Sequence, residues 1–179
     1  MINSKQRLTS TLSGADTGLL QVICPGGMMS MVCQDVGEKS APDWLAAHKN
    51  PSVMARLSLD LHNATGFENL GVPFCMTVEA EALGSSVDFG SLEIEPRITK
   101  SVLESPRHLN NLKFKGTQVS GRMPVVLEAI SILKNQNTGV PIIGAVTGPV
   151  SLASSLIDAE LFLRLVIKDK PFTQALMDL

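Results

Sequence analysis

The chain has 179 residues, a formal net charge of −2 and 44% hydrophobic residues, which allow one domain with a sizeable core. Its 15 basic and 17 acidic residues are scattered singly, which argues against a nucleic-acid partner. The polar start lacks the apolar core of a signal peptide, and no apolar run approaches the roughly 20 residues of a membrane helix. We therefore expect a cytoplasmic protein without membrane contacts.

The first predicted elements are a helix and a strand. The segment from Ser4 to Leu12 predicts a short opening helix, and the apolar run from Leu19 to Cys24 predicts a strand. Pro25, Gly26 and Gly27 follow directly and predict a glycine-rich turn.

The next helix is marked at both ends. Asn50 can cap its first turn, and Pro51 suits its first position, where a backbone N–H is not needed. Gly66 is expected to end it. Its buried face is predicted to carry four apolar residues: Met54, Leu57, Leu61 and Ala64.

Two apolar runs further along the chain predict parallel strands. They are Leu70–Phe74 and Pro141–Val146, the second of which has the composition of a strand buried on both faces. Between them, alternation in Val78–Leu83 and Val87–Ile98 predicts a small antiparallel excursion, and Arg122–Lys134 predicts a helix. The order of strands and helices predicts an α/β fold with a parallel sheet.

Three more helices are predicted at the end of the chain: Val150–Ile157, one capped by Asp158 and one opened by Pro171. The chain then offers three or four parallel strands. A (β/α)₈ barrel needs eight strands and about 250 residues. If this is a barrel sequence, about half of the barrel is present.

Chemistry in parallel α/β proteins gathers at the C-terminal ends of the strands. After the first predicted strand, Gly26 and Gly27 allow a close approach of the backbone to a ligand, and Met29 offers a soft wall for an apolar or sulfur-bearing group. The alternative is a tight turn whose methionines fill gaps in the core. We predict that these three residues contact substrate.

Two carboxylates, Glu79 and Glu81, follow the second predicted strand. Two residues apart on a strand they would share one face, where each would raise the pKa of the other. Such a pair suits proton transfer or an outer-shell role at a metal, and we predict both as catalytic residues. The alternative is that both lie on a solvated face.

A third strand end carries Thr147, Gly148 and Pro149 before a helix. Backbone N–H groups at such a helix start can face an anion, and we predict Gly148 as a substrate contact. Turns of this kind are more often purely structural.

The three cysteines and three histidines lie at none of the common zinc-site spacings, and no Cys-x-x-Cys is present. Cysteines used so sparsely suit a reducing compartment. We predict no metal site within residues 1–179.

Three segments, residues 24–31, 71–84 and 148–154, resemble the methylcobamide:coenzyme M methyltransferase group of the uroporphyrinogen decarboxylase superfamily. The resemblance implies the N-terminal half of a single TIM-barrel domain, with the C-terminal half absent. It implies a methyltransferase that moves a methyl group from a methylcobamide, carried by a corrinoid protein, to a zinc-bound thiol such as coenzyme M. The family's zinc ligands lie in its C-terminal half, so this half alone is expected to be inactive.

Uroporphyrinogen decarboxylase itself, a cofactor-free enzyme of porphyrin biosynthesis, is similar in the same regions. Its first loop carries arginines, whereas here no arginine occurs between Arg7 and Arg56. It has an aspartate that faces the pyrroles, and the nearest residue here is Asn69, whose amide lacks the charge that a cationic pyrrole intermediate needs. Both departures favour the methyltransferase, with Asn69 as a substrate contact. A third possibility is an inactive half-barrel that self-associates through uncovered apolar faces.

Overall fold

The computed structural model describes residues 2–24, 34–41, 43–112 and 119–178. The chain divides into two compact units. The first unit comprises residues 1–75, 91–95 and 125–145, and the second unit comprises residues 76–90, 96–124 and 146–179.

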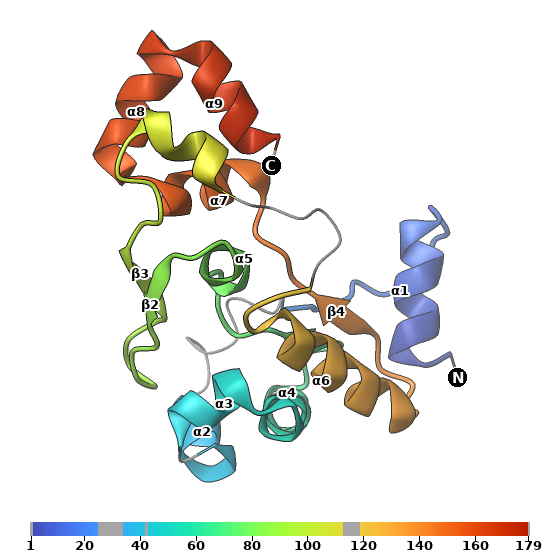
Figure 1. Ribbon diagram of the computed structural model, residues 1–179. Helices are drawn as coiled ribbons and strands as arrows, with labels where there is room; N and C mark the ends of the chain where they lie inside the picture. The colour runs from blue at the N-terminus through green and yellow to red at the C-terminus, as the bar shows by residue number, and fades with distance from the viewer. Residues whose placement is uncertain (1, 25–33, 42, 113–118, 179) are drawn as a thin grey trace. The chain divides into compact units, whose positions relative to one another are not determined.

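The first unit is built around a parallel pair of strands, β1 (Leu70–Val72) and β4 (Ile142–Gly144), in which Leu70 faces Ile142 and Val72 faces Gly144. Its helices, shown in Figure 1, are α1 (Ser4–Leu12), α2 (Gln34–Ser40), α3 (Trp44–Lys49), α4 (Pro51–Thr65) and most of α6 (Met123–Asn135). Every residue of β1 is buried, as its apolar sequence predicts. The parallel pairing confirms the predicted α/β class.

Helix α4 begins and ends where the sequence predicts. The Asn50 side chain accepts hydrogen bonds from the backbone N–H groups of Ser52 and Val53 at 2.9 and 3.2 Å. Gly66 ends the helix in the left-handed region, at φ 72°, which glycine adopts without strain. The predicted inner face is buried at Met54, Leu57 and Leu61, whereas Ala64 is exposed. These three side chains join β1 and α6 in one apolar core.

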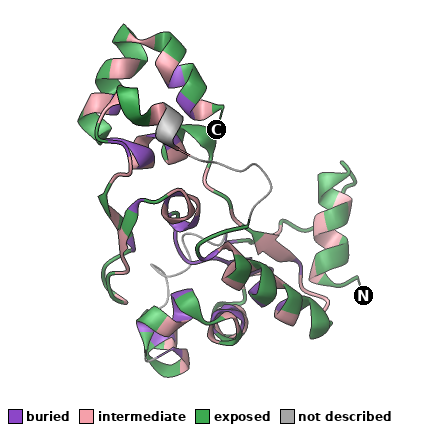
Figure 2. Ribbon diagram, in the orientation of Figure 1, coloured by how far each residue is buried: buried purple, intermediate pink, exposed green. Residues whose placement is uncertain are grey.

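Helix α1 has no buried residue (Figure 2) and is held to the first unit by polar contacts. The Lys5 backbone N–H donates to the Gly139 carbonyl at 3.0 Å. Arg7 forms an ion pair with Glu68, just before β1. The opening helix therefore stays attached without burying a full apolar stripe.

The predicted strand at Leu19–Cys24 is wrong, because this segment forms neither a strand nor a helix. One backbone bond ties it to the chain before β1, from the Glu68 N–H to the Val22 carbonyl at 2.7 Å. At Cys24, a side chain replaces the backbone partner. Asn69 Nδ2 donates to the Cys24 carbonyl and Asn69 Oδ1 accepts from the Cys24 N–H, each at 2.7 Å.

The second unit comprises an antiparallel hairpin and a group of helices. The hairpin pairs β2 (Ser86–Asp88) with β3 (Arg97–Lys100) and confirms the predicted antiparallel excursion. The other elements, shown in Figure 1, are α5 (Val78–Ala82), the 3₁₀ helix η2 (Pro106–Asn111), α7 (Pro149–Leu156), α8 (Ala159–Lys168) and α9 (Lys170–Met177). Their shared core contains Ala80, Leu103, Ala153, Leu156, Ile157, Phe162 and Leu176.

The prediction that Val78–Leu83 belongs to the excursion is wrong, because residues 78–82 form α5. The alternating pattern is compatible with a strand, but alanine and glutamate favour a helix. Successive residues of a helix are rotated by about 100°, so Glu79 and Glu81 point about 200° apart instead of sharing one face.

None of the described helices combines the length and apolar character that a membrane crossing needs.

Candidate functional site

The candidate site lies in the second unit, on the two chain segments that follow β1 and β4. The first segment contains Met76 and Thr77 and leads into α5. The second contains Thr147 and Gly148 and leads into α7. Each segment follows a strand of the parallel pair in the chain, the position at which the sequence predicts chemistry.

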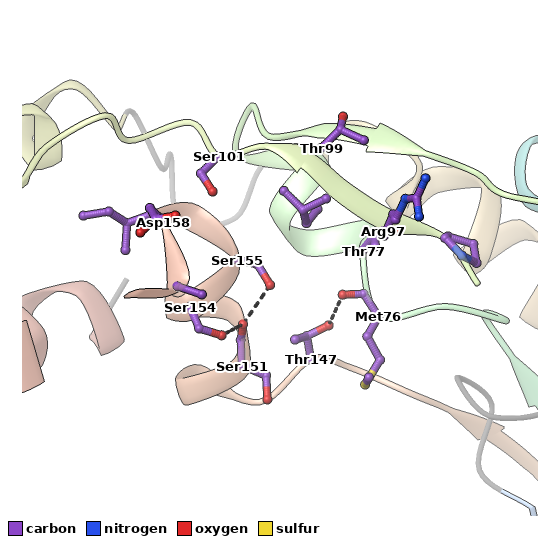
Figure 3. A pocket seen from close by; sticks show the side chains of 14 residues that line it. Met76, Thr77, Arg97, Thr99, Ser101, Thr147, Ser151, Ser154, Ser155 and Asp158 are labelled. Carbon is purple, nitrogen blue, oxygen red and sulfur yellow. Dashed lines mark hydrogen bonds between the residues drawn. The ribbon is translucent and has the colours of Figure 1, made fainter. Parts of the chain in front are cut away.

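Glu79 joins these two segments. Its Oε2 atom accepts a hydrogen bond from the Thr147 hydroxyl at 2.7 Å, and its Oε1 atom accepts one from the Thr147 backbone N–H at 3.3 Å. The same hydroxyl lies 3.2 Å from the Met76 carbonyl (Figure 3). Within the described residues, Glu79 makes no ion pair. It is therefore a partly buried carboxylate held by neutral donors, with its charge uncompensated by a neighbouring cation.

Glu81 has a different partner. It forms an ion pair with Arg122, whose side chain is only 6% exposed. Arg122 also donates from Nη2 to the Thr77 hydroxyl at 2.9 Å, and its guanidinium lies over the Phe89 ring, 4.7 Å from the centroid. Glu81 is thus the counter-ion of a buried arginine, whereas Glu79 makes no ion pair within the described residues.

An open pocket of about 560 Å³ is lined in part by Thr147, which contacts Glu79, and by Thr77, which contacts Arg122 (Figure 3). Its walls come from Met76 and Thr77, from β3 and the residues around it, and from the start of α7 to the start of α8. Half of the fourteen residues that line it carry a hydroxyl group: Thr77, Thr99, Ser101, Thr147, Ser151, Ser154 and Ser155. Such a surface suits a ligand that both donates and accepts hydrogen bonds.

Gly148 caps the start of α7, and its predicted role as a substrate contact stays a prediction. Its φ of −67° is open to any residue, and no atom lies within 4 Å of where a Cβ would be. Neither backbone strain nor crowding therefore explains a glycine here. The open space leaves room for a ligand close to the backbone.

Asn69 lies in the first unit and is fully buried. Both halves of its amide are used by the backbone of Cys24, as described above. Substrate contact by Asn69 stays a prediction. The predicted contacts Gly26, Gly27 and Met29 lie outside the described residues.

The described residues do not fit a zinc site. Among them, no three His, Cys, Asp or Glu side chains come close enough together to hold a metal ion. Cys24 and Cys75 are both buried. Burial raises the pKa of the Cys24 thiol, so the protonated form, which is a poor ligand, is favoured at neutral pH.

Sequence reasoning did not single out Arg122 or the hydroxyls of α7 as site residues. Arg122 lies 41 positions from Glu81, and no local spacing links the two. The signal near Arg122 is the preceding Gly121, whose φ is 58° and where a Cβ would meet the Ala82 backbone at 3.1 Å. That close approach brings Arg122 to α5, but it becomes visible only in the fold.

The sequence matches the uroporphyrinogen decarboxylase (URO-D) family over residues 3–179, and the chain belongs to this family.

Methylcobamide:CoM methyltransferase MtaA of Methanosarcina barkeri strain Fusaro is 32% identical over 177 residues, which are 98% of this chain and 51% of that protein. MtbA of Methanosarcina acetivorans, with the same enzyme name, is 37% identical over 121 residues, 66% of this chain and 35% of that protein. A solved methyltransferase from Methanosarcina mazei has a TM-score of 0.86 at 30% identity, covering 99% of this chain and 52% of its own. The chain thus spans about half the length of the full-length relatives it matches.

Proposed function

We propose that the protein containing this sequence transfers a methyl group from a methylcobamide, carried by a corrinoid protein, to a small thiol such as coenzyme M. The observation that carries this proposal is the similarity to MtaA across 98% of the chain. We also propose that this chain is the N-terminal half of a (β/α)₈ barrel domain. We propose further that the protein is cytoplasmic.

Methyl transfer to a thiol requires three changes. The thiol loses its proton, a bond forms between sulfur and the methyl carbon, and the cobalt–carbon bond breaks with its electron pair staying on cobalt. We assign the proton to Glu79, because its carboxylate is held at the strand ends by Thr147 and has no cation beside it within the described residues. Glu81 instead keeps Arg122 in place. The predicted zinc finds no ligand set among the described residues, so no step here runs through it.

Glu79→Gln in the full-length protein is expected to lower the rate of methyl transfer by about 100-fold, because the amide keeps a hydrogen bond to Thr147 but cannot accept the thiol proton. The measurement is the demethylation of methylcobalamin by coenzyme M, followed by absorbance. Glu128→Gln, at an exposed position of α6, serves as the control and should leave the rate unchanged.

Unchanged kinetics in the Glu79 variant would remove this residue from the mechanism. Decarboxylation of uroporphyrinogen by the wild-type protein, without methyl transfer, would overturn the proposal in favour of the decarboxylase that gives the family its name.

A second candidate role is self-association of the 179-residue chain without catalysis. Large apolar side chains are exposed on α8, at Leu163 (66%) and Ile167 (78%), and before α7 at Val146 (83%). Sedimentation velocity is expected to show species heavier than the 19.1 kDa of one chain. A clean monomer would argue against this role.

A further inference from the structure

A cavity of about 240 Å³ lies in the first unit, beside the chain that leads into β4. Its lining comes from Lys5 on α1, from the end of α6, and from residues 137–140 and Ile142 around the start of β4. The backbone hydrogen bond from Lys5 to Gly139 keeps α1 next to this loop (Figure 1). None of the described residues that line this cavity belongs to the candidate site of the second unit.

The cavity carries two positive charges that no acidic group balances. Lys5 and Lys134 are the charged residues among the described residues that line it, and neither makes an ion pair within the described ranges. Helix α1 contains no acidic residue, and the last turn of α6 contains none either. Two uncompensated cations at one cavity attract an anion.

The negative end of α6 has other donors than these lysines. The carbonyl groups of Leu133 and Lys134 accept from the backbone N–H groups of Gln136 and Asn137 at 3.2 and 3.3 Å. Two of the last carbonyls of the helix are thus satisfied by the main chain. The ammonium groups of Lys5 and Lys134 therefore remain available to a ligand.

The loop that forms one wall of the cavity packs closely on the start of α1. Gly139 has a φ of 72°, and a Cβ at this position would lie 3.1 Å from Asn3 Nδ2. Asn3 caps α1, where its side-chain oxygen accepts from the Gln6 backbone N–H at 2.9 Å. A glycine at position 139 therefore allows the first turn of α1, which contains Lys5, to lie against the loop.

A neutral donor and an apolar surface complete the cavity. The Thr138 hydroxyl oxygen accepts from the Val140 backbone N–H at 3.3 Å, which leaves the hydroxyl proton to donate to a ligand. Leu133 is buried, and Val140 and Ile142 are partly buried, and all three line the cavity. The cavity therefore suits an anion that has oxygen acceptors and that can carry a small apolar group.

We propose that this cavity binds a phosphate group, either as the free ion or as part of a phosphomonoester. At neutral pH a phosphomonoester carries a charge of about −1.5 to −2, which matches two ammonium groups better than one carboxylate does. Its oxygens accept from Lys5, Lys134 and Thr138, and lysine binds phosphate as a point charge. This site is separate from the proposed methyl transfer and does not depend on it.

The test measures the Kd of the full-length protein for inorganic phosphate and for butyl phosphate by equilibrium dialysis. Lys5→Ala/Lys134→Ala is expected to weaken binding by about tenfold, because two charge-assisted hydrogen bonds are lost. Thr138→Val changes no charge and should weaken binding by about threefold, because one neutral hydrogen bond is lost. Folding of the double variant should be unaffected, because both lysines are exposed and form no ion pair in the described part of the chain.

Lys168→Ala/Lys170→Ala is the matched control, because it removes the same charge from two other exposed lysines. Lys168 lies in the last turn of α8 and Lys170 in the first turn of α9, as Lys134 and Lys5 lie in the last turn of α6 and the first turn of α1. This variant should bind both probes as the wild type does. Equal losses in the two double variants would overturn the proposal, and so would an absence of phosphate binding by the wild type or an unchanged Kd in Lys5→Ala/Lys134→Ala.

The two probes distinguish the sources of the phosphate group. Tighter binding of butyl phosphate than of inorganic phosphate would support an organic phosphomonoester whose carbon chain contacts Leu133, Val140 and Ile142. Equal Kd values for the two probes, weakened alike in Lys5→Ala/Lys134→Ala, would support the free ion as the ligand.

Discussion

Arg122→Met is expected to lower the free energy of unfolding by about 3 kcal/mol, because it leaves the partly buried Glu81 carboxylate without its partner. It also removes the donor to the Thr77 hydroxyl and the cation over the Phe89 ring. Arg122→Lys should recover only part of the loss, because an ammonium group lacks the planar fork that reaches Glu81 and Thr77 together. Urea denaturation followed by circular dichroism gives the free energies of unfolding of the two variants.

The control for Arg122 is a second arginine–glutamate pair in the same unit. Arg164 and Glu160 form an i,i+4 ion pair on α8, with side chains 66% and 74% exposed. Arg164→Met should lower the free energy of unfolding by less than about 1 kcal/mol, because solvent screens such a pair. Equal losses of unfolding free energy in Arg122→Met and Arg164→Met would contradict the prediction that the buried Arg122 ion pair stabilises the fold more than the exposed Arg164 pair.

The Arg122 ion pair also bears on the candidate site. Thr77 lines the pocket, and α5 carries both Glu81 and Glu79. If Arg122 holds α5 in place, Glu81→Leu combined with Arg122→Met should regain part of the lost stability, since neither charge is then left without a partner.

Elements with strong local signals could be predicted from the sequence. Asn50, Pro51 and Gly66 specify α4 through capping and left-handed backbone geometry, which depend only on neighbouring residues. The two apolar runs around β1 and β4 are likewise local, and they pair in parallel as expected, but the prediction that the second run is buried on both faces is wrong, because Ile142 and Ile143 are only partly buried and Gly144 is exposed. The predicted fold class, α/β with parallel strands and a small antiparallel excursion, is therefore confirmed.

The wrong predictions occur where contacts between residues distant in the sequence determine the local structure. Residues 78–82 alternate in polarity as a strand does, yet they form α5. Residues 19–24 are apolar enough for a strand, but Leu20 is 97% exposed and the backbone of Cys24 pairs with a side chain. The partners of Glu79 and Glu81 lie 68 and 41 residues away, so the sequence could nominate both carboxylates without showing that only one carries a buried counter-ion.

Asn69→Ala is expected to lower the free energy of unfolding by about 3 kcal/mol, because it removes two hydrogen bonds to the backbone of the buried Cys24. The two bonds hold the segment before residues 25–33 against the start of β1, so their loss should loosen the first unit locally. Hydrogen exchange at the Cys24 amide reports this loosening directly. Asn63→Ala, at an exposed position of α4, is the control and should change stability by less than about 0.5 kcal/mol.

Asn69→Asp separates hydrogen bonding from side-chain shape. The carboxylate form can accept from the Cys24 N–H but repels the Cys24 carbonyl, whereas the protonated form can accept from one and donate to the other. Since burial disfavours the charged form, the proton is bound more tightly in the folded state than in the unfolded state. The penalty relative to wild type should therefore be small near pH 4 and grow as the pH rises toward about 7. A penalty that is constant with pH would show that the Cys24 carbonyl does not depend on a donor at position 69.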